Sequence, residues 1–370
     1  MSQLQSGEKI EKMLLDSGYF PTEDLTWKAT LFVNKFAMQS QSKGQAVSAL
    51  CLDGPPGSGK TEFVIKYKEV AEKCLEEKIN FIQYQCNTTT GREDLFEEIN
   101  IKAVVQNDAE NVILRGKLID AMEKLNNGEK VILFLDEFDK AKEETDDFLL
   151  SFLQSGQVFS TQLGTVEVKR EYLGNLQVFV VKNDKRERLT GPLESRLDYV
   201  HLTEMSPEIM HKVLMRAYGN QDERLVKLCS ILYELQYVNK EKLEKVTSCR
   251  ECLVSIRNCL DLMKVNAPQR IIYNTLLDGL CKIKDDREVF LSFMRQSNDK
   301  SINALCNLFK KDSAENEKTL AKIWLYEKEE ELSKKSETLE KKSNELDAKI
   351  AEAENLIKVL TEKNSNEKQL

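Results

Sequence analysis

The residues with the clearest chemical signature stand at positions 54–61, after an apolar run and before a helix-like stretch. They fit the pattern GxxxxGK followed by Ser or Thr, as Gly54, Pro55, Pro56, Gly57, Ser58, Gly59, Lys60 and Thr61. Glycines let successive backbone N–H groups turn toward phosphate oxygens, and the N-terminus of the following helix adds positive potential. We expect Lys60 to reach the β- and γ-phosphates of a nucleotide and the Thr61 hydroxyl to bind Mg²⁺. The alternative is a glycine loop with an incidental lysine.

An acidic pair, Asp136-Glu137, follows the apolar run 131–135. A buried strand that ends in Asp-Glu predicts that Asp136 lies beside the phosphate loop and holds Mg²⁺ through water. Glu137 would then orient or polarise the attacking water, which favours hydrolysis over transfer of the phosphate to a small acceptor. The alternative is a solvated turn at the end of a strand.

The elements that must position these residues are predicted from the hydrophobic pattern of the first half. Short apolar or β-branched runs bounded by turn residues predict buried strands at 49–53, 80–86, 130–135 and 176–182. Amphipathic stretches between them, such as 61–78 and 118–126, predict helices. This alternation indicates an α/β fold, a parallel sheet with helices on both faces. Together with the motif at 54–61 it fits a P-loop NTPase parallel sheet.

The rest of the chain departs from this alternation. Two segments, at about 99–115 and 157–169, predict inserted β-hairpins, and after residue 205 the strand signals stop. We therefore expect an α/β nucleotide-binding domain at 1–205, a small all-α lid domain at 206–312 and a charged C-terminal helix at 313–370.

The C-terminal segment carries a seven-residue repeat. A sustained heptad favours a coiled coil, and the alternative is a single solvated helix stabilised by salt bridges, because several companion positions are polar. The repeated positions are Leu325, Leu332, Leu339, Leu346, Ala353 and Leu360.

Charge and hydropathy limit the partners. The 370 residues include 54 basic and 62 acidic side chains, for a net charge of −8. This balance does not favour sequence-independent binding to nucleic-acid phosphates. The longest apolar run, 131–135, is far short of the roughly 20 residues that span a bilayer, so we expect no membrane association.

Nine cysteines in a chain without an evident export signal predict reduced thiols and a cytoplasmic location. Cys249, Cys252 and Cys259 stand three and seven residues apart, a spacing that also places them on one helix face. A zinc site would need further ligands, and the only histidines are His201 and His211. A packed helix face is the favoured interpretation.

With both motifs placed, the chain resembles an AAA+ ATPase, closest to the MoxR branch of the helix-2-insert group, over about residues 15–290. The stretch VFVVKNDKRERL resembles the strand that presents the family's sensor-1 Asn, and 191–197 resembles the segment with the arginine finger. Residues 252–258 resemble the sensor-2 helix.

That resemblance implies roles for further residues. Asn183 would bind the γ-phosphate or the attacking water, and Arg196 would enter the site of a neighbouring subunit, although Arg186 or Arg188 could be the finger instead. Arg257 would sense the γ-phosphate from the lid. Their structural alternatives are a turn Asn and ordinary ion pairs.

The resemblance also has gaps. Tyr19 and Phe20 stand where the family surrounds adenine with apolar side chains, but such an aromatic pair is as often simple core. Lys182 replaces a small polar residue before the sensor Asn, and Ile256 replaces the usual Pro. The text TTTGREDLFEEI lacks an aromatic–apolar–Gly pore loop, which speaks against processive threading of a protein.

These features lead us to expect an enzyme that hydrolyses ATP with Mg²⁺, assembles into a homo-oligomeric, hexameric ring and remodels an unidentified protein client. The hairpin tips, at 106–110 and 159–164, would contact the client. One alternative is a nucleic-acid motor or loader of a restriction or defence type. Another is a nucleotide-gated scaffold that acts through its coiled coil, and the tail could either assemble the ring or dock a partner.

Overall fold

The computed structural model describes residues 4–38, 47–91, 94–95, 97–99, 105, 113–160, 164–183 and 189–296, together with 302, 325, 328, 332, 333, 335, 336, 339 and 340. By its internal contacts the chain divides into two units. One comprises Met1–Asn220 with Ser248–Leu253, and the other comprises Gln221–Thr247 with Val254–Leu370. The first unit therefore extends beyond residue 205, the end expected for the nucleotide-binding domain.

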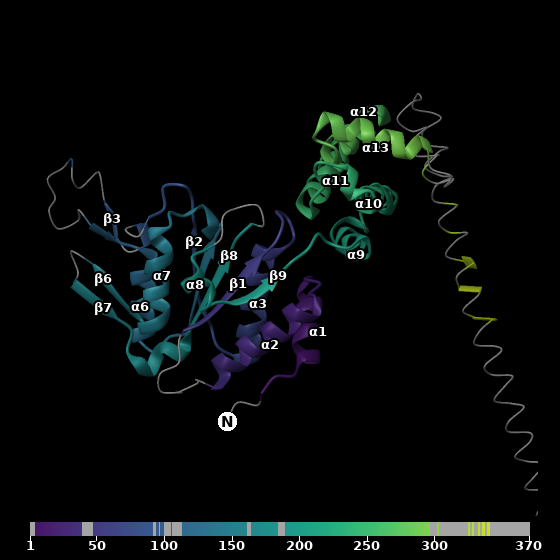
Figure 1. Cartoon of the computed structure of the whole chain (residues 1–370). Coiled ribbons are helices and arrows are strands. Elements are labelled where there is room, and N and C mark those ends of the chain that lie inside the picture. The colour runs from purple at the N-terminus through teal and green to yellow at the C-terminus, as the bar shows by residue number, and fades with distance from the viewer. Residues whose placement is uncertain are drawn as a thin grey trace, which may run out of the picture. The chain divides into compact units, whose positions relative to one another are not determined.

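The first unit is built on a five-stranded sheet in the order β2-β5-β8-β1-β9, in which every adjacent pair is parallel (Figure 1). All six positions of β5 and of β8 are buried. Strands covered on both faces are mostly apolar, which is why the hydrophobic pattern predicts them. The strands are β1 (Ser48–Asp53), β2 (Asn80–Gln85), β5 (Val131–Asp136), β8 (Leu176–Val181) and β9 (Asp198–His201).

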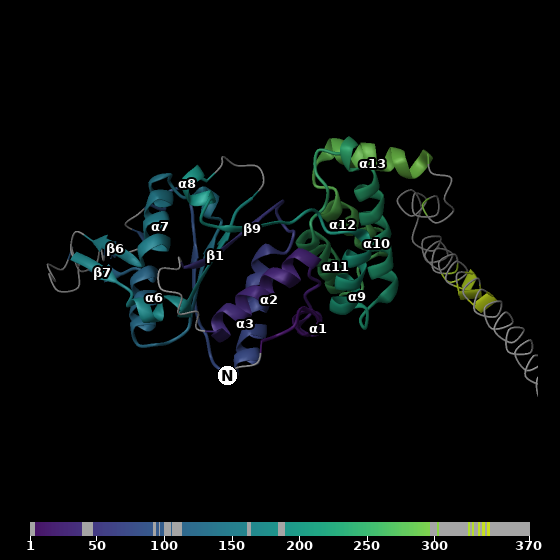
Figure 2. The ribbon, with the colours of Figure 1, turned by 60° about the horizontal axis from the view of Figure 1, so that its bottom comes forward.

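Helices cover both faces of this sheet, as the α/β prediction requires (Figure 1, Figure 2). One face packs against α1 (Gly7–Ser17), α2 (Glu23–Met38) and α3 (Lys60–Leu75), and the other against α6 (Lys117–Asn126), α7 (Glu144–Ser155) and α8 (Gly191–Glu194). Strand β1 shows the alternation, because Leu50 and Leu52 enter the first core and Ala49 and Cys51 the second.

One boundary and one strand differ from the predictions, each for a local reason. Helix α3 stops at Leu75, short of the predicted 61–78, because Glu76 takes the left-handed conformation with φ 53°. Strand β9 was not predicted at all. Its sequence, DYVH, is short and only partly apolar, and its single buried residue is Val200.

Two antiparallel pairs stand apart from the main sheet. Strand β3 (Glu97–Ile99) pairs with β4 (Ile113–Arg115), and β6 (Gln157–Ser160) pairs with β7 (Gly164–Glu167). The first pair is shorter than the segment 99–115 suggested and begins at Glu97. The tip at 106–110 and residues 161–163 lie outside the described residues.

The remaining described elements are short 3-10 turns and helices. Turn η1 (Phe138–Lys140) follows β5, and η2 (Arg170–Asn175) precedes β8. Helix α9 (Pro207–Tyr218) belongs to the first unit. The second unit contains α10 (Glu223–Val238), η3 (Lys240–Lys242), most of α11 (Cys249–Lys264), α12 (Gln269–Leu280) and α13 (Lys284–Gln296).

The second unit is held by a buried polar cluster around Gln236. The Gln236 amide donates to the Leu280 carbonyl at 3.1 Å, and its oxygen accepts from the Thr247 hydroxyl at 2.6 Å. Since these groups are buried, their hydrogen bonds fix the loop before α11 against the ends of α10 and α12.

The cysteine-rich helix α11 is described in full, and the tail only in part. Cys252 and Cys259 are buried on α11, and no group of three or more potential metal ligands occurs among the described residues. Leu325, Leu332 and Leu339 are helical and exposed. The heptad positions after Leu339 lie outside the described residues, so the coiled coil stays a prediction. None of the described helices is long and apolar enough to cross a membrane.

Candidate nucleotide-binding site

The candidate phosphate loop connects β1 to α3, and its backbone at Gly54 and Gly59 suits only glycine. Gly54 has φ +143°, and a Cβ there would lie 2.1 Å from the Leu202 carbonyl oxygen. Gly59 has φ +90° immediately before the first turn of α3. Side chains at either position would be strained, so the glycines keep the backbone in a turn that opens the helix.

Lys60 is buried at the start of α3, with 5 % of its surface exposed. Its ammonium donates to the carbonyl oxygens of Gly54 at 2.7 Å and Pro55 at 2.8 Å, and lies 3.4 Å from the Ser58 hydroxyl. The cation therefore lies within the loop, where phosphate oxygens could replace these carbonyl acceptors.

Thr61 and Asp136 come together at the carboxyl edge of the sheet. The Thr61 hydroxyl donates to the Asp136 carboxylate, with Oγ1 3.2 Å from Oδ2 and 3.4 Å from Oδ1. Burial raises the pKa of Asp136, while the Thr61 hydroxyl and the Glu137 N–H oppose that rise. A hydroxyl and a carboxylate are the hard oxygen ligands that Mg²⁺ prefers, so this donor set fits a magnesium nucleotide.

Glu137 follows Asp136 in a left-handed backbone conformation, with φ 53°. Its Oε2 accepts from the Gln85 side-chain amide at 3.2 Å and forms an ion pair with the Lys140 ammonium at 2.5 Å. Gln85 ends β2 directly beside Asp136 in the parallel register. Gln85 could not be predicted, because the order of strands in the sheet cannot be read from one sequence. Lys140 is three residues after Glu137 in turn η1, and no motif marks it.

Asn183 lies at the same edge. Strand β8 lies between β1 and β5, with Val181 opposite Leu52 and Val180 opposite Leu135. The half-buried Asn183 comes two residues after this strand. The register therefore brings Asn183 to the edge where the phosphate loop and the acidic pair lie.

The predicted arginine roles stay predictions. Arg196 is exposed in the turn between α8 and β9. Arg186 and Arg188 lie outside the described residues. Arg257 is exposed on the part of α11 that belongs to the second unit.

Tyr19 is a core residue beside the phosphate loop. It is 8 % exposed, its ring centroid lies 5.5 Å from that of Phe63, and a Cβ on Gly59 would be 3.5 Å from its ring. Burial raises the pKa of Tyr19. Phe20 is half-buried. Tyr19 thus supports the end of the loop, whatever its role toward a nucleotide base.

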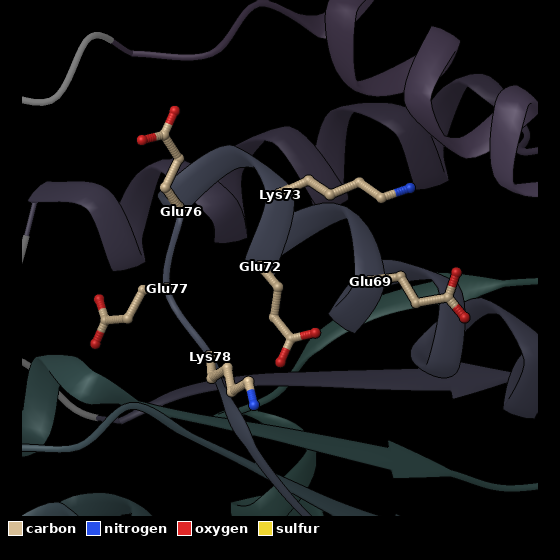
Figure 3. A pocket seen from close by; sticks show the side chains of 6 residues that line it. All are labelled: Glu69, Glu72, Lys73, Glu76, Glu77 and Lys78. Carbon is tan, nitrogen blue, oxygen red and sulfur yellow. The ribbon is translucent and has the colours of Figure 1, made fainter.

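A charged hollow lies at the opposite end of α3 from Lys60 (Figure 3). Its four carboxylates would repel a triphosphate, so it does not compete as a nucleotide site. The lining side chains are Glu69, Glu72, Lys73, Glu76, Glu77 and Lys78.

The sheet, the glycine loop that opens α3 and the Thr61–Asp136 contact define a P-loop NTPase fold. Residues 49–197 match the family model of the AAA domain of the dynein-related subfamily. This segment is accordingly an AAA-type ATPase domain, as the resemblance to AAA+ proteins implied. Comparison with curated proteins found no match to the chain.

Proposed function

We propose that this protein is a ring-forming, MoxR-like AAA+ ATPase that uses ATP hydrolysis to remodel a protein partner in the cytoplasm. The observation that carries the proposal is the contact between Thr61 and Asp136, because it joins the phosphate loop to the acidic strand end. The eight described cysteines are free thiols, which agrees with a reducing compartment.

In this proposal different residues of the chain bind the phosphates, hold Mg²⁺ and activate the attacking water. Backbone N–H groups of 57–59 and the Lys60 ammonium bind the phosphates, and Thr61 and Asp136 hold Mg²⁺, the latter through water. Bound Mg²⁺ would neutralise charge on the phosphate oxygens. Glu137 orients the attacking water and accepts its proton. Asn183 hydrogen-bonds the γ-phosphate or that water.

The ring is proposed from Arg196. An exposed arginine next to β9 can enter the site of a second subunit, where a finger of this kind is worth about 10³–10⁵ in rate. Contacts of this head-to-tail kind close into a ring or continue as a spiral. Arg257 and the residues Tyr19 and Phe20 would complete the site from the lid and the N-terminal segment.

The client is proposed to meet the β6–β7 hairpin. Phe159 is 57 % exposed on β6 and offers an apolar anchor to an unfolded or partly folded segment. Substituting Phe159 with Ser should leave basal ATP turnover unchanged and abolish any stimulation by the client.

The decisive experiment compares Lys60→Ala and Glu137→Gln in ATP binding, turnover and oligomeric state. Lys60→Ala should lose nucleotide binding, and Glu137→Gln should retain ATP but stop turnover and enrich the ring in light scattering. Arg196→Ala mixed with Glu137→Gln should recover some activity at mixed interfaces. A fully active monomer, or turnover that survives Glu137→Gln, would contradict the proposal.

A further inference from the structure

A largely buried ion pair lies next to the start of the phosphate loop, where three adjacent strands end. The Lys182 ammonium lies 3.2 Å from Asp53 Oδ2, and the side chains are 10 % and 15 % exposed. Asp53 is the last residue of β1, and Lys182 directly follows β8. The imidazole Nδ1 of His201, at the end of β9, is 3.6 Å from the same carboxylate oxygen.

The carboxylate has a second contact that reaches the loop. Asp53 Oδ1 accepts from the Gly54 backbone N–H at 2.9 Å. Gly54 is the first residue of the loop and is already confined by the Leu202 carbonyl. Asp53 therefore fixes the entry of the phosphate loop with one oxygen and faces Lys182 with the other.

The other end of the pair is next to Asn183. The Lys182 backbone N–H donates to the Leu52 carbonyl at 3.0 Å, so both main chain and side chain tie this residue to β1. Asn183 is the following residue, and its side chain has to be aligned with phosphates that the loop holds.

From this arrangement we infer that Asp53 and Lys182 are a positioning pair, which fixes Asn183 relative to the phosphate loop. The inference rests on the role proposed for Asn183. A buried pair of opposite charges tolerates little change in geometry, since separating the charges leaves each one desolvated and unpaired. Such a link suits a site in which a misplacement of about 1 Å can cost about 10²-fold in rate.

The consequence for kinetics is asymmetric. In Lys182→Met the bond from Gly54 N–H to Asp53 persists, so the loop should still bind ATP. Asn183 loses its charged link to the loop, so kcat should fall by about 10- to 100-fold, while KM for ATP changes by less than about threefold. Lys182→Arg keeps the charge and should recover most of the rate.

Two further variants separate positioning from stability. Lys130 is an equally buried lysine, paired with Glu77 at 2.5 Å just before β5, at the opposite edge of the sheet. Lys130→Met is therefore the matched control, expected to lower the thermal midpoint without changing kcat. The double variant D53N/K182M keeps an acceptor for Gly54 N–H and leaves no charge unpaired.

The test measures kcat, KM and the thermal midpoint for these variants of the full chain. We expect D53N/K182M to regain the wild-type midpoint while kcat remains low. A kcat for Lys182→Met within twofold of wild type would overturn the inference, and so would a kcat that recovers together with the midpoint in the double variant. Failure of the proposed function is a different result, namely turnover that persists in Glu137→Gln.

Discussion

Thr61 Oγ1 lies 3.2 Å from Asp136 Oδ2, although 75 positions separate the two residues in the sequence. Only β8 lies between β5 and β1 in the sheet. The end of β5 is therefore close to the loop that leads from β1 into the first turn of α3. The two motifs that suggested nucleotide chemistry are thus parts of one site.

The ion pair between Lys140 and Glu137 gives a first prediction. Lys140→Ala removes the cation that pairs with Glu137 Oε2 and competes with the attacking water for this carboxylate. Because the two side chains are 31 % and 29 % exposed, the pair is worth about 0.2–1 kcal/mol, and basal turnover should rise by no more than about fivefold. Steady-state ATPase assays check this, with Lys142→Ala as the control. A loss of turnover in Lys140→Ala would instead mean that the lysine helps to orient Glu137.

A second prediction concerns the segment that carries Arg196. The buried Asp146 on α7 accepts from the Thr190 backbone N–H at 2.7 Å, just before α8. Asp146→Ala should release the start of α8 and lower turnover by at least about tenfold, since a finger contributes far more than that. Asp146→Asn keeps the acceptor and should stay near wild type. Equal rates in both variants would show that this bond does not position Arg196.

Stability supplies a third prediction. The Tyr67 hydroxyl donates to Gln177 Oε1 at 2.7 Å, and Gln177 Nε2 donates to the Phe32 carbonyl at 2.6 Å, all within the core. Tyr67→Phe leaves the Gln177 oxygen buried without this donor, which costs about 1–3 kcal/mol of the free energy of unfolding. Denaturant unfolding measures it, and Tyr172→Phe, at a half-buried position, should change the free energy by less than about 0.5 kcal/mol.

The fourth prediction is a pH dependence at Glu72. Burial acts to raise its pKa, but the hydrogen bond from Ile79 N–H and the ion pair with Lys68 outweigh burial and leave the pKa lowered from 4.5. A lowered folded pKa adds stability that is present above the unfolded value and lost as pH falls through the folded one.

Glu72→Gln keeps the acceptor for Ile79 and removes only the charge. The variant should therefore be less stable than wild type at pH 7 by a few tenths of a kcal/mol, as for an exposed pair. Unfolding midpoints measured down to about pH 3 should converge. A difference that stays constant over this range would rule out the carboxylate as its source.

The sequence predicts the central strands well because β5 and β8 are buried at every position and five of the six residues in each are apolar. It fails at β9, an edge strand with one buried residue. The residues of the phosphate loop and the acidic pair follow from motif spacing alone. Gln85 does not follow from the motifs, because its contact with Glu137 depends on β2 lying beside β5. Lys182 stands out in the sequence only as a departure from the family's pattern. Its pairing with Asp53 depends on β8 lying beside β1.

The missed strand β9 has a mechanical consequence. It starts two residues after Arg196 and pairs with β1 from Leu50 to Asp53, the residue that leads into the phosphate loop. If Arg196 acts in a neighbouring subunit, a displacement of Arg196 would shift β9. The hydrogen bonds between β9 and β1 would pass this shift to the phosphate loop of the subunit that carries the arginine. Successive subunits could then sense one another's turnover through the sheet itself, without any relay through the helical lid.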